Sequence, residues 1–273
     1  MFGFWKQILV LLISSFVLLV PLTCPAQTDQ CAVKIPGNPL PDLIVNPVRL
    51  RNDLLVTQEK FSATDCAVVE GCVSGKGNHQ LLRFTSATPN VGKGDLVIGD
   101  PLQCPNLFTQ SACHNHLHFK QYADYRVWTE TGYSNWVANR VLSEPTNTGT
   151  NAVLLAQAQQ SGDLIVGRKQ GFCIIDTDKF DPNAPDTKKY TLCGTNTASG
   201  NQGLQVGWED SYGQQLDCQY VEIDKLPAGT YFIEVQTNAE QALPEADYTN
   251  NSTAVKFQFI PKHGQTPAQA VPQ

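Results

Sequence analysis

Three histidines at alternate positions are the residues of this sequence best suited to chemistry. His114, His116 and His118 lie within five residues and are three of the five histidines in the 273-residue chain. On a strand, alternate side chains share one face, so the three imidazoles would point the same way while Leu117 and Phe119 pack on the other face. Imidazole nitrogens suit copper, zinc, iron or nickel, whereas calcium and magnesium prefer oxygen. The spacing therefore predicts a transition-metal site, and it leaves copper and zinc equally compatible.

A straight strand would hold the outer two histidines far apart. The Cα atoms of His114 and His118 would be separated by roughly 13 Å, so a shared ion requires the outer rings to lean inward or the strand to coil. The alternatives are a solvent-facing strand that happens to carry histidines and a metal that is only structural. Because histidine is scarce in this chain, metal binding is the favoured interpretation.

Short apolar segments bounded by turn residues surround the histidines and must position them. The candidate strands besides the histidine segment are 42–45, 53–56, 80–84, 94–99, 125–128, 164–169, 172–175, 220–223, 231–235 and 254–259. Many short strands, few helical periods and several cysteines predict an all-β fold, an antiparallel β sandwich with long loops and disulfide bonds.

Three regions carry more specific expectations. Residues 220–223 and 231–235 alternate around a Pro-Gly turn, which predicts two consecutive strands. Within the poorly patterned region 129–161, residues 154–160 suit either a helical turn or a strand, and residues 147–151 are expected to form a loop.

The chain begins with the pattern of a secretory signal. Lys6 precedes an apolar run over residues 8–20, and Ala26 supplies a small residue before a cut. This run is short for a membrane span. We therefore expect residues 1–26 to be removed and the mature protein to be secreted, either extracellular or periplasmic.

The expected mature chain divides into three parts. Residues 27–41 form an extended arm held by Cys31, residues 42–260 form one domain, and residues 261–273 form a disordered tail that is poor in apolar residues. The net charge of −6 becomes −7 when Lys6 is lost. That charge disfavours nucleic acid and anionic membranes as partners.

Removal of Cys24 leaves an even number of cysteines. The eight are Cys31, Cys66, Cys72, Cys104, Cys113, Cys173, Cys193 and Cys218. An even count in an exported chain predicts disulfides rather than a scatter of buried thiols.

Several motifs follow the histidines in a recognisable order. They are Gly167-Arg168-Lys169-Gln170-Gly171-Phe172-Cys173, Gln202-Gly203-Leu204, Asp210-Ser211-Tyr212 and Asp217-Cys218-Gln219, joined by Leu40-Pro41-Asp42-Leu43, Cys66 to Cys72, Leu82-Arg83-Phe84 and Asp247-Tyr248-Thr249-Asn250-Asn251. Any one of them is weak evidence, but the ordered set resembles the catalytic domain of the lysyl oxidase family over most of the mature chain.

The resemblance implies a copper-dependent amine oxidase whose organic cofactor is made from its own side chains. His114, His116 and His118 match the copper ligands, and Lys169 and Tyr212 match the residues that become lysine tyrosylquinone. A quinone is an electron sink that no ordinary side chain provides. Its carbonyl condenses with a primary amine, which can be peptidyl lysine, a base removes the α-proton, and hydrolysis releases the aldehyde. Molecular oxygen then restores the quinone and yields hydrogen peroxide and ammonia.

Other interpretations remain open. Taken alone, Lys169 is an ordinary surface lysine and Tyr212 an ordinary loop tyrosine. A chain that did not form the quinone would be a non-enzymatic extracellular β-sandwich protein that binds copper or zinc. A third interpretation is an adhesion or matrix module in which zinc is only structural.

This chain departs from the family pattern in three places. Asp124 precedes Tyr125 where the family usually has a histidine, which predicts Asp124 as the general base; an ion pair with Arg126 is the alternative. The loop between the copper strand and Lys169 is longer than in the animal enzymes. Fewer cysteines lie between residues 173 and 218 than in the animal enzymes.

A second metal site is implied near the end of the domain. Glu245, Asp247, Asn250 and Asn251 form a dense set of oxygen ligands, and the family places such a set beside residues matching Asp42 and Leu43. Oxygen ligands suit calcium. The alternative is a turn rich in Asp and Asn that caps itself.

Disulfide pairings follow from spacing and from the family pattern. The short spacing favours Cys66 with Cys72, and the resemblance implies Cys113 with Cys193. Elimination then pairs Cys173 with Cys218 and Cys31 with Cys104.

Overall fold

The computed structural model describes residues 39–111, 113–168, 171–263 and 268–273. The predicted signal, most of the predicted arm, Cys31 and Lys169 lie outside these residues. The strands are β1 (Leu55–Phe61), β2 (Gly77–Arg83), β3 (Ser86–Pro89), β4 (Leu96–Gly99), β5 (Phe108–Gln110), β6 (Leu117–Phe119), β7 (Ala123–Thr129), β8 (Leu164–Val166), β9 (Asp178–Lys179), β10 (Gln202–Leu204), β11 (Trp208–Tyr212), β12 (Tyr220–Glu222), β13 (Gly229–Thr237), β14 (Ser252–Ile260) and β15 (Gln269–Pro272). The helices are α1 (Pro47–Asn52), α2 (Cys66–Val69), α3 (Glu130–Asn139), α4 (Gly149–Ser161) and the 3₁₀ helix η1 (Pro105–Leu107).

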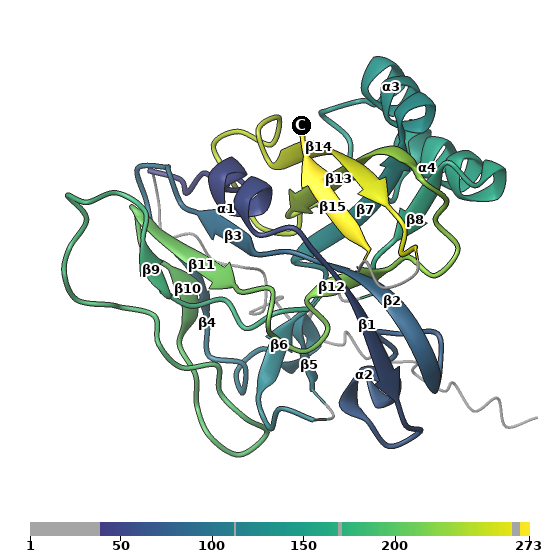
Figure 1. The fold of residues 1–273 in the computed structure, drawn as a ribbon. Coiled ribbons are helices and arrows are strands. Elements are labelled where there is room, and N and C mark those ends of the chain that lie inside the picture. The colour runs from purple at the N-terminus through teal and green to yellow at the C-terminus, as the bar shows by residue number, and fades with distance from the viewer. Residues whose placement is uncertain (1–38, 112, 169–170, 264–267) are drawn as a thin grey trace, which may run out of the picture. The chain divides into compact units, whose positions relative to one another are not determined.

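The strands pair into five antiparallel sheets across the described residues (Figure 1). The largest has the order β15-β14-β13-β7-β8, and the others are β1-β2-β12, β3-β11-β9, β10-β4 and β5-β6. The prediction of an all-β fold is therefore confirmed. None of the helices in this part of the chain has the length and apolar composition of a membrane span.

One run of packed aromatic rings connects the sheets that carry the expected site. Tyr125 of β7 packs on Phe84 with ring centroids 4.8 Å apart and on Phe172 at 5.9 Å. Phe172 in turn packs edge-on against Tyr212 of β11 at 4.8 Å. The main chain of Phe172 also forms an isolated bridge with Phe119 at the end of β6. Phe172 is therefore held between the histidine segment and β11.

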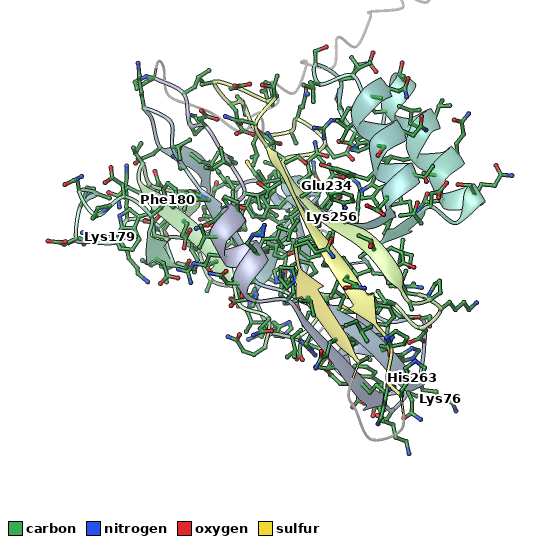
Figure 2. All side chains as sticks on the ribbon, turned by 45° about the horizontal axis from the view of Figure 1, so that its top comes forward. Lys76, Lys179, Phe180, Glu234, Lys256 and His263 are labelled. Carbon is green, nitrogen blue, oxygen red and sulfur yellow. A yellow bond between two sulfur atoms is a disulfide. The ribbon has the colours of Figure 1, made fainter. Side chains whose placement is uncertain are left out.

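A buried glutamate holds helix α3 against the largest sheet. Glu234 of β13, labelled in Figure 2, is fully buried. It accepts hydrogen bonds from the indole N–H groups of Trp128 and Trp136 and lies 3.4 and 3.2 Å from the guanidinium nitrogens of Arg126 and Arg140. A buried charge requires such partners, because desolvation without them is very costly. The pairing anchors α3, and α4 lies beside it against β8 (Figure 1).

Three segments differ from the expectations based on sequence. Residues 42–45 contribute only the isolated bridge of Leu43 with Asn90, and residues 172–175 contribute only that of Phe172 with Phe119. The two strands predicted around the Pro-Gly turn are present as β12 and β13, but they belong to different sheets. Residues 149–151, expected in a loop, begin α4. Helices α3 and α4 bury only Gly132, Trp136 and Asn151, so their sequence shows no apolar helical period.

The expected disordered tail contains a strand. Residues 269–272 form β15, which pairs with β14 from Phe257↔Pro272 to Ile260↔Gln269. Ala268 and Ala270 are buried, and the Arg51 guanidinium donates to the carbonyl oxygen of Gln273. The segment is ordered by main-chain pairing and two small side chains, which composition alone does not reveal.

The described disulfides differ from the predicted pairings. Cys66 is bonded to Cys113, Cys72 to Cys218 and Cys173 to Cys193. Because residues 66–69 form the helical turn α2, the two cysteines of this short loop project to different neighbours rather than to each other. The pairings Cys66–Cys72, Cys113–Cys193 and Cys173–Cys218 are therefore wrong. The pairing Cys31–Cys104 involves a residue outside the described range.

Candidate active site

The histidine segment is bent and does not form one strand. Only His118 lies within β6, opposite Thr109 of β5, and the chain turns through Asn115, whose φ is 26°. The bend brings the imidazoles together: ring centroids lie 5.7 Å apart for His114–His116, 6.5 Å for His114–His118 and 4.7 Å for His116–His118. The prediction of a single strand is wrong, but the three rings converge.

Two of the imidazole nitrogens are close enough to share one ion. His116 Nε2 and His118 Nε2 lie 2.8 Å apart. Two nitrogens bound to the same zinc ion at about 2.0–2.1 Å lie roughly 3.3 Å apart in a tetrahedral arrangement, somewhat farther than these two. In the metal-free chain the same approach suits a hydrogen bond between the two rings. The donor set is all nitrogen, which fits copper or zinc and does not fit calcium.

The site also contains residues that sequence reasoning did not assign to it. Ser111 Oγ lies 3.1 Å and Glu70 Oε1 lies 3.7 Å from His114 Nδ1, while Asp217 Oδ2 lies 3.8 Å from His114 Nε2. Glu70 belongs to the Cys66–Cys72 segment, which the two disulfides bring to the histidines. The position of Glu70 between two cysteines could have indicated that disulfides place it near the histidines. The predicted Cys66–Cys72 bond instead closed this segment on itself.

Tyr212 ends β11 in a half-buried position. Its hydroxyl donates to the carbonyl oxygen of Cys173. Burial, and then the nearby Asp210 carboxylate, raise the pKa of Tyr212 well above its usual value. Both effects disfavour the phenolate form of Tyr212.

Lys169 lies outside the described residues, but the chain just after it is placed. A Cβ atom on Gly171 would lie 3.4 Å from the Cβ of His118. Phe172 follows and contacts the ring of Tyr212. Two consecutive described residues, Gly171 and Phe172, thus lie between the histidine segment and Tyr212.

The structure places Asp124 in an ion pair. Its carboxylate accepts a hydrogen bond from Arg126 Nη2 on the same strand, and Arg126 also donates to Gln236 and Glu234. This is the arrangement that the sequence left as the alternative. The role of general base stays a prediction.

The expected calcium ligands come together from distant parts of the chain. Glu245 accepts hydrogen bonds from the main-chain N–H of Leu43 at 2.6 Å and from the side chain of Asn251 at 2.7 Å. Asn250 donates to Asp42 at 2.9 Å. Burial raises the pKa of Glu245 to about 7, although the hydrogen bonds that it accepts from Asn238, Leu43 and Asn251 oppose the rise.

Two features of this oxygen cluster bear on an ion. The Oδ1 atoms of Asn250 and Asn251 are buried and accept no hydrogen bond within the described part of the chain, as expected of oxygens that face an ion. Asp247 accepts from Thr249 N and Oγ1 in a local turn, as the alternative predicts. The residues fit calcium, and its presence stays a prediction.

Comparison with known proteins agrees with this arrangement. Residues 153–266 match the family model for lysyl oxidase. Lysyl oxidase homolog 2A of Danio rerio is 25% identical over 246 residues, a match that covers 87% of this chain and 28% of that protein. Lysyl oxidase homolog 2 is 27% identical in Mus musculus and 26% identical in Homo sapiens, over 77% of this chain and 23% of each relative.

The matched ranges include the candidate site residues. The chain spans about a quarter of the length of these relatives. A match covering 87% of 273 residues necessarily includes residues 114–118, and the family match includes Lys169, Tyr212 and Asn251. Both the imidazole segment and the two cofactor candidates lie within matched sequence. Across both regions the chain is therefore similar to the lysyl oxidase family.

Proposed function

We propose that this protein is an exported copper-dependent amine oxidase that converts primary amines, including the side chains of peptidyl lysine, to aldehydes. The net reaction consumes the amine, dioxygen and water and releases aldehyde, ammonia and hydrogen peroxide. The observation that carries the proposal is the convergence of three imidazoles, with two ring nitrogens 2.8 Å apart. A solvent-facing strand with three unrelated histidines would spread the rings apart.

The proposed metal ligands are His114, His116 and His118. Copper bound there would, with dioxygen, supply the oxidation that converts the Tyr212 ring to the quinone. His118 is nearly buried, whereas His114 and His116 are partly exposed. One side of the ion would therefore be fixed by packed protein while the other remains accessible to oxygen and to an amine.

Lys169 and Tyr212 are the proposed sources of lysine tyrosylquinone. For the cross-link to form, the lysine must present an uncharged amine to the oxidised ring. The contact between Gly171 and His118 and the contact between Phe172 and Tyr212 support an approach of the two loops. The neutral phenol of Tyr212 must lose its proton before oxidation, so we expect no quinone in metal-free protein.

The proposed location and partners follow from the same features. An exported protein, extracellular or periplasmic, is supported by the leader pattern over residues 1–26 and by three disulfides among the described cysteines. The negative net charge favours cationic substrates such as alkylammonium groups over nucleic acids or anionic membranes. Calcium at the oxygen cluster is the second proposed ion.

Peroxide release tests the proposed activity. Copper-loaded mature protein should release hydrogen peroxide from simple primary amines, and metal-free and zinc-loaded protein should not, because zinc has no redox chemistry. A coupled peroxidase assay with ammonia measured in parallel would detect turnover in equal amounts of both products. Copper-loaded protein that binds the metal tightly but releases no peroxide would instead support a non-enzymatic copper-binding protein.

Asp124→Asn tests the proposed base. This variant should bind copper and form the quinone yet lose turnover by about 10²–10⁴-fold, because an amide cannot accept the α-proton. Folding should survive, since Arg126 keeps Glu234 and Gln236 as partners. Asp95→Asn is the matched control, because Asp95 is also an ion-paired aspartate and lies 2.6 Å from Lys189 Nζ. Near-normal turnover of Asp124→Asn would assign the base to another residue.

A further inference from the structure

A glutamate and a serine form a hydrogen-bonded chain that ends on His114. Ser111 Oγ lies 2.5 Å from Glu70 Oε1, accepts the main-chain N–H of His114 at 3.0 Å, and lies 3.1 Å from His114 Nδ1. Glu70 Oε1 also accepts the main-chain N–H of Cys113 at 3.2 Å. This Glu70–Ser111 relay therefore contacts both the main chain and the ring of His114, the first proposed metal ligand.

Counting donors and acceptors fixes the direction of this chain. A serine hydroxyl has one proton and two lone pairs, and an ionised carboxylate only accepts hydrogen bonds. The Ser111 proton must therefore point to Glu70, which leaves the lone pairs of Ser111 facing the N–H of His114 and its Nδ1. For Nδ1 to bond to a lone pair it must carry a proton, so in a neutral ring Nε2 is left with the lone pair that a metal requires.

We infer that Glu70, acting through Ser111, sets the tautomer of His114 and keeps its Nε2 available for the ion. Metal-bound histidines commonly donate their other ring N–H to a partner that orients the ring. Here that partner is a hydroxyl fixed by a carboxylate. Glu70 and Ser111 are positioning residues, and the inference rests on the proposed metal-binding function of the three histidines.

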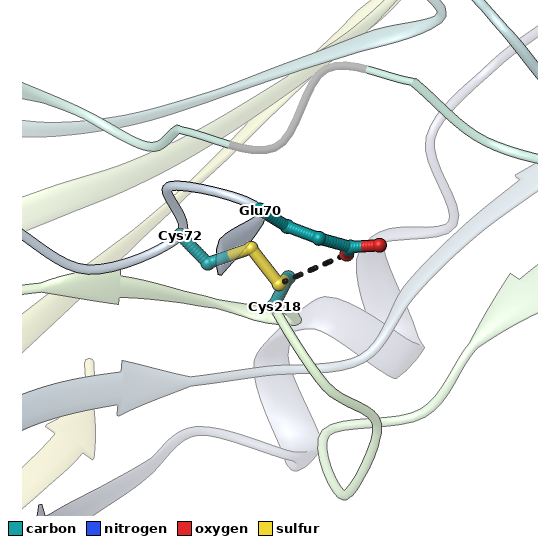
Figure 3. A group of neighbouring side chains, drawn as sticks. All are labelled: Glu70, Cys72 and Cys218. Carbon is teal, nitrogen blue, oxygen red and sulfur yellow. Dashed lines mark hydrogen bonds between the residues drawn. A yellow bond between two sulfur atoms is a disulfide. The ribbon is translucent and has the colours of Figure 1, made fainter. Parts of the chain in front are cut away.

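Two disulfides hold Glu70 in place for this role. Cys66–Cys113 joins the start of α2 to the residue before His114, and Cys72–Cys218 joins the residue two positions after Glu70 to the residue after Asp217. Figure 3 shows the Glu70 carboxylate directed at the Cys218 sulfur, 3.8 Å away. A disulfide sulfur has no proton to donate, so this contact is packing. Disulfides thus restrain the main chain on both sides of Glu70.

The surroundings of the two ring nitrogens of His114 differ in exposure. On the Nδ1 side, the Glu70 side chain is 14% exposed, whereas on the Nε2 side Asp217 is 60% exposed. A partly buried carboxylate is the stronger acceptor for orienting a hydroxyl, because competing water is largely excluded. The Nε2 side is the open side, where an ion would enter.

The test measures the tautomer of His114 directly in metal-free mature protein labelled with ¹⁵N-histidine. At mildly alkaline pH, where an ordinary imidazole is neutral, two-bond ¹⁵N–¹H spectra should show the His114 proton on Nδ1. In Ser111→Ala and in Glu70→Gln this preference should be lost, because alanine has no acceptor and a glutamine amide can donate to Ser111. Ser111→Thr, which keeps the hydroxyl, should restore it.

Copper affinity supplies a second measurement. Competition with a chelator should show a loss of about 10–100-fold in Ser111→Ala and in Glu70→Gln, and near-normal affinity in Ser111→Thr. Thr57→Val is the matched control, since Thr57 donates to Glu59 at 2.7 Å on β1 and removal of that hydroxyl should change neither measurement. The His79 resonances report folding in every variant, because both ring nitrogens of His79 are hydrogen bonded, to Asp224 and to Gly75.

The outcomes separate this inference from the proposed function. A proton on Nε2 of His114 in the wild-type protein, or an unchanged tautomer and affinity in Ser111→Ala, would overturn the inference even if the enzyme releases peroxide. A wild-type protein that shows the Nδ1 proton but releases no peroxide would leave the relay standing and remove the oxidase activity.

Discussion

Lys169 and Tyr212 should be recovered as one cross-linked peptide after the mature protein is loaded with copper in air. Peptide mapping by mass spectrometry should find the two tryptic segments joined, and the protein should gain a visible quinone absorbance that phenylhydrazine changes. The physical requirement is a distance: the lysine amine must reach the oxidised ring. Phe172, which contacts the Tyr212 ring at a centroid distance of 4.8 Å, lies three residues from Lys169, so the connecting chain is short enough to allow it.

Two variants should remove this cross-link completely. Lys169→Ala has no amine to add, and Tyr212→Phe lacks the phenol oxygen that is oxidised, so each should lose the joined peptide, the absorbance and peroxide release while still binding copper. Tyr212→Phe removes the hydrogen bond that the hydroxyl donates to the Cys173 carbonyl, at a cost to folding of about 1–3 kcal/mol. Lys188→Ala and Tyr190→Phe are matched controls on a neighbouring loop. Two separate, unmodified peptides from fully copper-loaded, aerated wild-type protein would end the amine oxidase proposal.

Calcium should raise the thermal midpoint of the protein, and EGTA should lower it. Glu245 is 4% exposed, and the Asn250 and Asn251 side-chain oxygens lack donors among the described residues, so an ion would compensate oxygens that folding removed from water. Binding at a hundredfold excess over Kd contributes about 2.7 kcal/mol. In a domain of this size the increase would be about 5–10 °C. Differential scanning calorimetry with EGTA, and then with added calcium, measures it.

A matched pair of aspartates makes this test specific. Asp247→Asn should abolish the calcium response, while the local turn survives because an asparagine oxygen can still accept from Thr249. Asp181→Asn is the control, because Asp181 accepts the N–H of Asn183 in the same way but stands outside the cluster. An identical melting temperature with EGTA and with calcium would mean that the Asp and Asn residues of this turn only cap one another.

Local sequence patterns predict elements that depend on neighbouring residues, but not elements that depend on distant partners. The strand-rich composition predicted the all-β class, and strands β7, β13 and β14 lie where alternating apolar residues indicated. The pattern did not predict α3, and it offered a helical turn only as one of two options for residues 154–160 of α4, because these helices bury few side chains. It also missed β15, which depends on pairing with β14. Edge pairing is a property of the neighbouring strand, so no local pattern reports it.

For the site, the sequence by itself determined which chemistry was available. Three closely spaced imidazoles predicted an ion of the copper or zinc type from ligand type and short spacing alone. The oxygen-rich residues 245–251 predicted calcium only together with the family resemblance, and a turn that caps itself was the alternative.

Tertiary structure alone decided how those residues are positioned. The bend at Asn115, the meeting of Leu43 with Glu245, and the bonds of Cys66 to Cys113 and Cys72 to Cys218 each join segments through backbone geometry or across long separations. The disulfides show the physical reason most clearly. Six residues of separation made a local Cys66–Cys72 bond look natural, but a single helical turn between them directs the two sulfurs to different partners. That redirection is what brings Glu70 to Ser111 and His114.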